Sequence, residues 1–390
     1  MGKRRDLGRR VWTPCFVLLL CVGVAHATDF NFSGFASFTA GKVFSGNGQN
    51  STLGLVYHCP CFLANYEYAG VYDNKGWTAQ PESLVAAQMN AHIDDDLSAT
   101  VQLDGRDVRD DAKATVDWAY LTYQLNNHWS VQAGRKRIPM YYYADSNYIG
   151  YSYVWVRPPV DVYGWDVYEY DGANVLYRTN FGDWGLLANG WVGEQDSKNN
   201  VYWTNLYNGG INTESNWKDI AGAYLDLSND NYGFRLIYMQ NALAVTEHPG
   251  PGGATTPGMD GSWFRQRVFG AAFTADVNDW LVRAEVNEVK RTAPWAAPAA
   301  PAGIVALGHR FGKFTVMGTY SVYWENTSPT YQYPQRDYTR TATVRWDFHK
   351  SAALKFQYDS VKDKSPNGTG GYGNTFGDAN LVTVSLVTVF

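Results

Sequence analysis

The 390-residue sequence has no long apolar run after its first 27 residues. A membrane-spanning helix needs about 20 consecutive apolar residues, so a chain crossing by helices is excluded. Cysteine is scarce as well. Cys15 and Cys21 lie within the first 27 residues, which leaves only Cys59 and Cys61. Two cysteines are too few to build a disulfide scaffold.

Basic tracts and catalytic motifs are also missing. The formal net charge is −5, and removing residues 1–27, with five basic residues and one acidic residue, would lower it to −9. An acidic chain without a basic tract argues against nucleic acid as a partner. We find no G-x-S-x-G, no CxxCH and no metal-spaced histidine pair. The sequence therefore predicts no catalytic residue, no metal and no cofactor.

The two remaining cysteines are separated by Pro60 alone. Exported cysteines oxidise, so a local disulfide between Cys59 and Cys61 is the simplest interpretation, although a ring of that size is strained. A redox or metal role remains an open alternative.

Residues 1–27 have the pattern of a secretory signal peptide. Five basic residues precede an apolar stretch near residues 14–24, and Ala25-His26-Ala27 supplies a small-residue cleavage site. We expect cleavage after Ala27, which leaves residues 28–390 as a single exported domain.

Alternation of apolar and polar residues dominates the rest of the chain, in which aromatic residues are abundant (16% of the sequence). Residues 380–390 form the clearest example: Val382, Val384 and Leu386 share one face, and Thr383 and Ser385 share the other. Segments of roughly 9–12 residues repeat this pattern. Such alternation predicts strands with one face in lipid and one in water.

Short polar turns alternate with long loops between these strands. The turns are residues 94–96, 126–128, 182–183, 228–231, 276–279, 312–313 and 349–351, and the loops are roughly 42–79, 107–114, 139–170, 195–217, 243–262, 291–302, 327–336 and 362–379. Fifteen connections predict sixteen antiparallel strands, which would close into an all-β transmembrane barrel with short periplasmic turns and long external loops. A barrel of this size should enclose an aqueous channel.

The C-terminal strand ending at Phe390, with the turn and loop pattern, resembles the sixteen-stranded general porins of Gram-negative outer membranes. The resemblance implies that Phe390 belongs to an assembly signal read by the barrel-assembly machinery. It also implies a homotrimer surrounded by outer-membrane lipid and lipopolysaccharide. In that family the third long loop folds into the lumen and sets acidic residues against a basic wall.

Residues 139–170 would be that loop here, since they are dense in aromatic residues and carry Pro158-Pro159. The candidate constriction residues are Asp145, Tyr151, Trp155, Arg157, Asp161, Asp166 and Glu169. The candidate basic wall consists of basic residues that fall on the polar face of their predicted strands: Arg106, Lys136, Arg178, Arg235, Arg283, Arg310, Arg345 and Lys355. The alternation of the strand before Pro139 would place Arg135 and Arg137 on the outward, apolar face. We expect a β-bulge to change this, because the loop begins at Pro139.

The sequence thus predicts a passive outer-membrane porin for small hydrophilic solutes and ions. A channel selective for sugars or anions is one alternative. A hydrolase active at the barrel rim and a barrel without conductance are two others.

Overall fold

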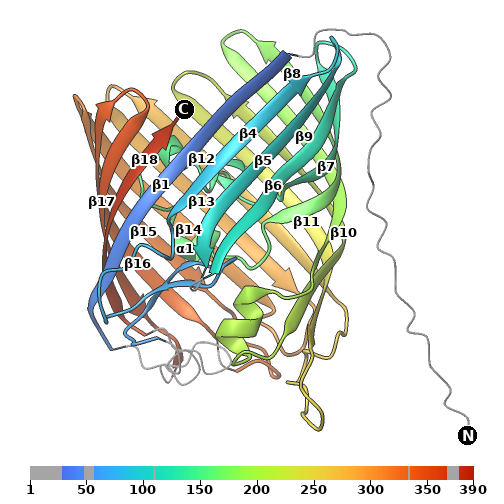
Figure 1. The fold of residues 1–390 in the computed structure, drawn as a ribbon, viewed down its shortest axis with the longest axis vertical. Coiled ribbons are helices and arrows are strands. Elements are labelled where there is room, and N and C mark those ends of the chain that lie inside the picture. Colours follow the sequence, from blue (N-terminus) through green and yellow to red (C-terminus); the bar gives the residue numbers. More distant parts are fainter. Residues whose placement is uncertain (1–28, 48–56, 109–110, 333, 367–376) are drawn as a thin grey trace, which may run out of the picture.

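The computed structural model describes residues 29–47, 57–108, 111–332, 334–366 and 377–390, so the predicted signal peptide lies outside the described residues. A closed barrel of sixteen strands, β1 and β4–β18, forms the molecule (Figure 1). Its strands are β1 (Asp29–Gly46), β4 (Leu84–His92), β5 (Leu97–Val108), β6 (Asp111–Gln124), β7 (Trp129–Arg137), β8 (Glu169–Phe181), β9 (Trp184–Ser197), β10 (Thr213–Ser228), β11 (Tyr232–Glu247), β12 (Phe264–Val277), β13 (Trp280–Arg291), β14 (Ala299–Phe311), β15 (Phe314–Trp324), β16 (Arg336–His349), β17 (Ala352–Asp363) and β18 (Ala379–Val389).

Pairing of the first strand with the last closes the barrel. β1 runs antiparallel to β18, with Phe35 opposite Val389, and its other edge pairs with β4. The backbones of Gly34 and Phe390 exchange two hydrogen bonds of 2.7 and 2.9 Å. Every barrel strand therefore has two neighbours, and the predicted sixteen-stranded antiparallel barrel is confirmed.

The connections follow the predicted alternation with one exception. All seven short turns lie between consecutive barrel strands, at the rim where the C-terminus is marked in Figure 1. The expected long loop at 107–114 is wrong: β5 continues to Val108 and β6 begins at Asp111, which pair with each other. Among the described residues, no helix is long and apolar enough to cross a membrane.

Strand faces alternate as the sequence predicts. On β17, Phe356 and Tyr358 are 46% and 45% exposed, whereas Lys355 and Gln357 are 0% and 3% exposed. Exposed aromatic side chains gather at both ends of the outer surface: Trp129, Phe181, Trp280, Phe311 and Phe314 by the short turns, and Phe44, Trp263 and Trp324 by the long loops. This apolar outer wall with aromatic ends is the surface that a bilayer requires.

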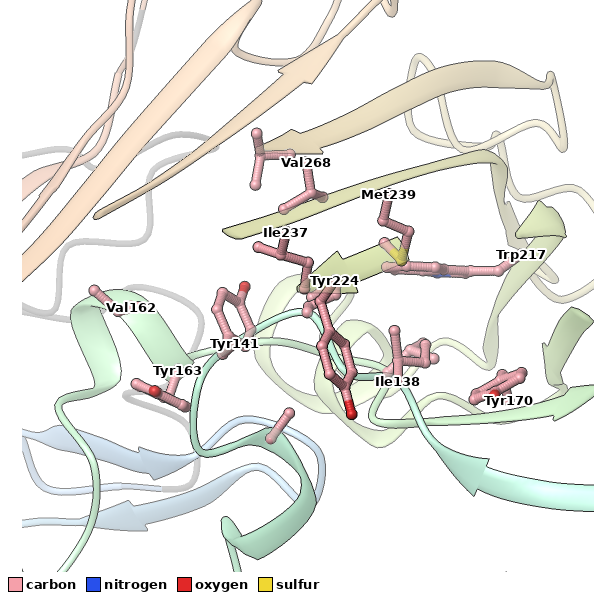
Figure 2. Packing of buried hydrophobic residues seen from close by; sticks show 14 of the residues in the cluster. Ile138, Tyr141, Val162, Tyr163, Tyr170, Trp217, Tyr224, Ile237, Met239 and Val268 are labelled. Carbon is pink, nitrogen blue, oxygen red and sulfur yellow. The ribbon is translucent and has the colours of Figure 1, made fainter. Parts of the chain in front are cut away.

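The inward face is less polar than expected on one side of the barrel. On β11, Ile237, Met239 and Val245 point inward and are buried, while Phe234 and Leu236 point outward. A strand with apolar side chains on both faces is stable only when both faces are shielded from water. The cover inside comes from the segment between β7 and β8, whose Tyr141 and Tyr163 belong to the same apolar cluster (Figure 2).

Three glycines lie side by side across β7, β8 and β9. Gly134 is opposite Gly172, and Gly172 is opposite Gly193. A Cβ atom at Gly172 would lie 2.1 Å from the Val192 carbonyl oxygen, and one at Gly193 would lie 2.7 Å from the Tyr170 ring. The strands approach so closely here that only glycine fits.

We therefore expect Gly172→Ala to destabilise the barrel by about 1–3 kcal/mol, the usual cost of overpacking. Gly318→Ala on β15 is the matched control, because its Cβ would meet no atom within 4 Å. Urea unfolding followed by tryptophan fluorescence in detergent measures both variants. Equal midpoints for the two variants would contradict the close approach.

Candidate functional site

The segment from Ile138 to Tyr168 joins β7 to β8 and lies against the inward faces of other strands. Pro139 and Pro158-Pro159 prevent it from continuing as a strand, because proline has no N–H to donate. Its backbone forms only short helical turns, at Ala144–Ser146, Gly150–Ser152 and α1 (Val160–Tyr163). Many of its carbonyl groups therefore need partners from the barrel.

Basic side chains of three strands supply those partners. Lys355 Nζ donates to the carbonyl oxygens of Gly150, Tyr153 (2.8 Å) and Trp155 (2.5 Å). Arg345 Nη1 donates to the carbonyl oxygens of Tyr151 and Tyr153 at 2.7 and 2.8 Å.

Arg235 Nη1 reaches the carbonyl oxygens of Tyr141 and Tyr142 at 3.1 and 3.0 Å. Lys355, Arg345 and Arg235 were predicted as charges of an open basic wall. They are 0%, 9% and 8% exposed, and hold the backbone of the segment.

Side chains of the segment are fixed to the barrel as well. Arg157 donates to both carboxylate oxygens of Glu82 at 2.6 Å and to Asp359 at 2.7 Å. Trp155 Nε1 donates to Thr319 at 2.8 Å, and the Tyr151 hydroxyl donates to the Lys350 carbonyl at 2.9 Å. Removing one partner of a buried ion pair costs about 3–5 kcal/mol, so the Arg157 contacts fix the segment strongly.

Two of the predicted constriction acids are also hydrogen-bonded in place. Asp161 accepts a 2.5 Å hydrogen bond from Ser321. Asp166 accepts hydrogen bonds from Trp203 (2.8 Å) and Ser215 (2.9 Å). Burial raises the pKa of the Asp166 carboxyl, and these two hydrogen bonds oppose that shift.

Glu169 is the first residue of β8 rather than part of the loop, and its carboxylate lies 3.7 Å from Arg137.

Asp145 differs from the other acids of the segment because it is exposed. Its carboxylate is within electrostatic reach of Arg235 and Lys136, and Lys136 also interacts with Arg178. Lys136 on β7 donates to Gln132 and, at 3.3 Å, to Asn174, and Arg178 on β8 is exposed. One exposed carboxylate of the segment is therefore within electrostatic reach of basic side chains on β7 and β11.

A cluster of buried charges lies beside this region, around Tyr148. Arg106 pairs with Asp104, and Arg137 pairs with Asp117 at 3.1 Å. Both guanidinium groups lie 4.2 Å from the centre of the Tyr148 ring.

The Tyr148 hydroxyl donates to Glu67 in the loop after β2 (Phe62–Asn65), which pairs with β3 (Gly70–Tyr72). Burial raises the pKa of Glu67, and the nearby arginines oppose that shift.

The expected bulge near Arg135 is wrong in its location. The β7 pairings show no register shift, whereas β6 shifts against β5 near Asp117. Arg135 points outward to Asp171 at 2.6 Å, with its side chain 39% exposed, and Arg137 is buried. The bulge in β6 turns Asp117 inward and gives Arg137 its partner.

Cavities lie on both sides of the segment. One of about 480 Å³ opens toward the short turns and includes Arg283 and Arg310, both paired with Asp276. The other, of about 170 Å³, lies where the long loops converge and includes Trp165 and Asp166. Tyr163, whose hydroxyl donates to Glu285 on β13, belongs to the apolar cluster packed between barrel and segment.

The sequence identified most basic residues of this site and missed several of their acidic partners. Glu82, Asp226 and Glu285 were not among the candidates, yet each accepts hydrogen bonds that position the segment or its arginines. Asp226 and Glu285 fall on the inward-facing positions of β10 and β13, and this alternation could have identified them.

Cys59 and Cys61 form a disulfide at the long-loop end, and Cys61 is buried against Leu63 and Leu206. Among the described residues, no group of three or more His, Cys, Asp or Glu side chains could hold a metal ion.

The sequence matches no protein-family model and no curated protein. Solved structures do match. The outer membrane channel DcaP of Acinetobacter baumannii superposes with a TM-score of 0.61 at 12% identity, covering 93% of this chain and 97% of that one. Salmonella typhi OmpF, solved in complex with daunomycin, superposes with a TM-score of 0.58 at 13% identity, covering 93% of this chain and 98% of that one.

The trimer form of OmpT, an outer membrane protein of Vibrio cholerae, superposes with a TM-score of 0.56 at 12% identity, covering 94% of this chain and 100% of that one. The chain therefore has the fold of an integral outer-membrane β-barrel, and the resemblance to general porins holds at the level of the fold.

The anchoring role of Lys355 can be tested with Lys355→Met. Each buried carbonyl left without a partner costs about 1–3 kcal/mol. We expect faster proteolysis within residues 138–168 and larger fluctuations of the single-channel current. Lys313→Met, in an exposed short turn, is the control. Unchanged proteolysis and current noise in K355M would show that other contacts hold the segment alone.

Proposed function

We propose that the chain is an outer-membrane porin through which small hydrophilic solutes and ions diffuse passively. A sixteen-stranded barrel is too wide for its own side chains to fill, and its apolar exterior suits lipid. The observation that carries the proposal is the exposed Asp145 of this segment, whose carboxylate is within electrostatic reach of Lys136 on β7. Residues 138–168 narrow the channel at this level.

Assembly and partners follow from the same proposal. The chain forms a homotrimer, which the trimer form of the Vibrio cholerae protein supports by similarity of fold. Phe390 serves the barrel-assembly machinery as part of its recognition signal, and outer-membrane lipid and lipopolysaccharide surround the outer wall. The signal peptide ends at Ala27. No enzymatic activity is assigned, because the polar groups of the segment serve to position it.

Single-channel recording of the refolded residues 28–390 in planar bilayers tests the channel. We expect long-lived ohmic steps, with three equal closures for each insertion event if the trimer is correct. A barrel with intact β-structure and no conductance at any salt concentration would refute the porin. One closure for each insertion would refute only the trimer.

The charge arrangement makes a further prediction. Asp145→Asn removes the exposed carboxylate but keeps its shape. We expect the cation-to-anion permeability ratio to fall by roughly two- to fivefold, since one charge at 4 Å contributes about 1 kcal/mol in water. Asp94→Asn, in a short turn, should leave the ratio unchanged. The ratio is measured from reversal potentials in a salt gradient, and an unchanged ratio in D145N would place the ion path elsewhere.

A further inference from the structure

The cavity of about 170 Å³ at the long-loop end has aromatic walls. Several separate stretches of the chain contribute rings to it, among them Tyr66, Trp165, Tyr202 with Trp203, Phe264 and Trp295. The long-loop ends of β11, β12, β13, β15, β16 and β17 also contribute to the lining. The cavity therefore lies on the side from which a solute would enter past the long loops.

Carboxylates outnumber basic groups in the same lining. Among the described residues, Asp161, Asp166, Glu325 and Asp337 line the cavity, against one guanidinium, that of Arg291. In the described part of the chain, none of these four carboxylates forms an ion pair with a basic side chain.

Their hydrogen bonds come from neutral groups. Glu325 accepts from the Tyr323 hydroxyl (2.8 Å) and the Tyr331 hydroxyl (2.6 Å), and Asp337 accepts from Gln335 (2.7 Å). Neutral donors orient a carboxylate without cancelling its charge. A cation among these four carboxylates would stabilise their ionised forms, and the low-dielectric walls strengthen that attraction.

Arg291 shows that an aromatic wall of the cavity already holds a cation. Its guanidinium lies 5.6 Å from the centre of the Trp165 ring, and its Nε donates to Gln266 at 3.2 Å. Tryptophan faces attract cations through the ring quadrupole, most strongly where water is displaced. The lining thus combines the two features that favour a positively charged organic molecule: aromatic faces and acceptors without basic partners.

We propose that this outer cavity binds protonated organic amines, molecules that carry an ammonium group on an apolar or aromatic body, before they pass the channel. The inference rests on the proposed porin function and adds a class of solute to it. The ammonium donates to the carboxylates near Asp337 and Glu325, and the apolar body packs on the tryptophan faces. Anions are repelled by the same carboxylates. Neutral sugars could stack on the rings but would gain nothing from the excess negative charge.

The test uses 2-phenylethylamine, with 2-phenylethanol as the neutral molecule of matching ring and chain and maltose as the sugar. Two readouts are taken: block of the single-channel current by probe added on the long-loop side, and quenching of tryptophan fluorescence of the folded protein in detergent. We expect the amine to bind at least tenfold more tightly than the alcohol or the sugar in both readouts.

Asp337→Asn and Glu325→Gln keep shape and remove charge, and each should weaken amine binding at least threefold. Asp230→Asn is the matched control: its carboxylate lines the cavity on the opposite side of the segment, and binding should not change. Circular dichroism verifies that each variant folds, and either carboxylate variant suffices if the other does not fold.

Equal binding of amine and alcohol, tighter binding of maltose, or equal weakening by D230N and D337N would overturn the inference. The proposed porin function is tested by a different outcome of the same experiment. A conducting barrel that does not bind the amine contradicts only the cavity, whereas a folded barrel without conductance that still binds the amine by fluorescence contradicts only the channel.

Discussion

The structure depends on one constraint: a strand facing lipid must pair all its backbone polar groups within the protein, since the bilayer core offers no hydrogen-bonding partner. Closure of β1 on β18 satisfies it, and the Gly34–Phe390 backbone pair brings the closure to the last residue of the chain. Phe390 lies over Gly34, where a Cβ atom would come within 2.4 Å of its ring. Phe390 is therefore part of the contact between β1 and β18 that closes the barrel.

The same constraint applies inside the barrel in a different form. The segment between β7 and β8 has an irregular backbone, so its carbonyl groups cannot pair along a sheet. Lys355, Arg345 and Arg235 donate seven hydrogen bonds from the wall to six of these carbonyl groups. A basic side chain on the inner wall can therefore act on permeating ions or support the segment, and burial distinguishes the two roles: Arg178 is exposed and Lys355 is not.

The sequence predicted the barrel, its strand number and its short turns because strand alternation is local and has a period of two. It could not predict which inward charges stay exposed, since that depends on where residues 138–168 pack. Asp145 and Asp161 are both acids of this segment, yet Asp145 is exposed, whereas Asp161 accepts a hydrogen bond from Ser321, 160 positions away. The bulge at Asp117 was missed for a related reason, because it depends on the pairing partner and not on β6 alone.

The anchors of the segment also determine when it can dock during synthesis and folding. Lys355 is 205 positions from Gly150 and 200 positions from Trp155, and Arg345 is 194 positions from Tyr151. Contacts so distant in sequence form late, because the entropy of closing the intervening chain must be offset first. The contacts of Lys355 and Arg345 can form only once β16 and β17 are in place, so strands near the C-terminus help to fix the position of a segment that precedes them by about 200 residues.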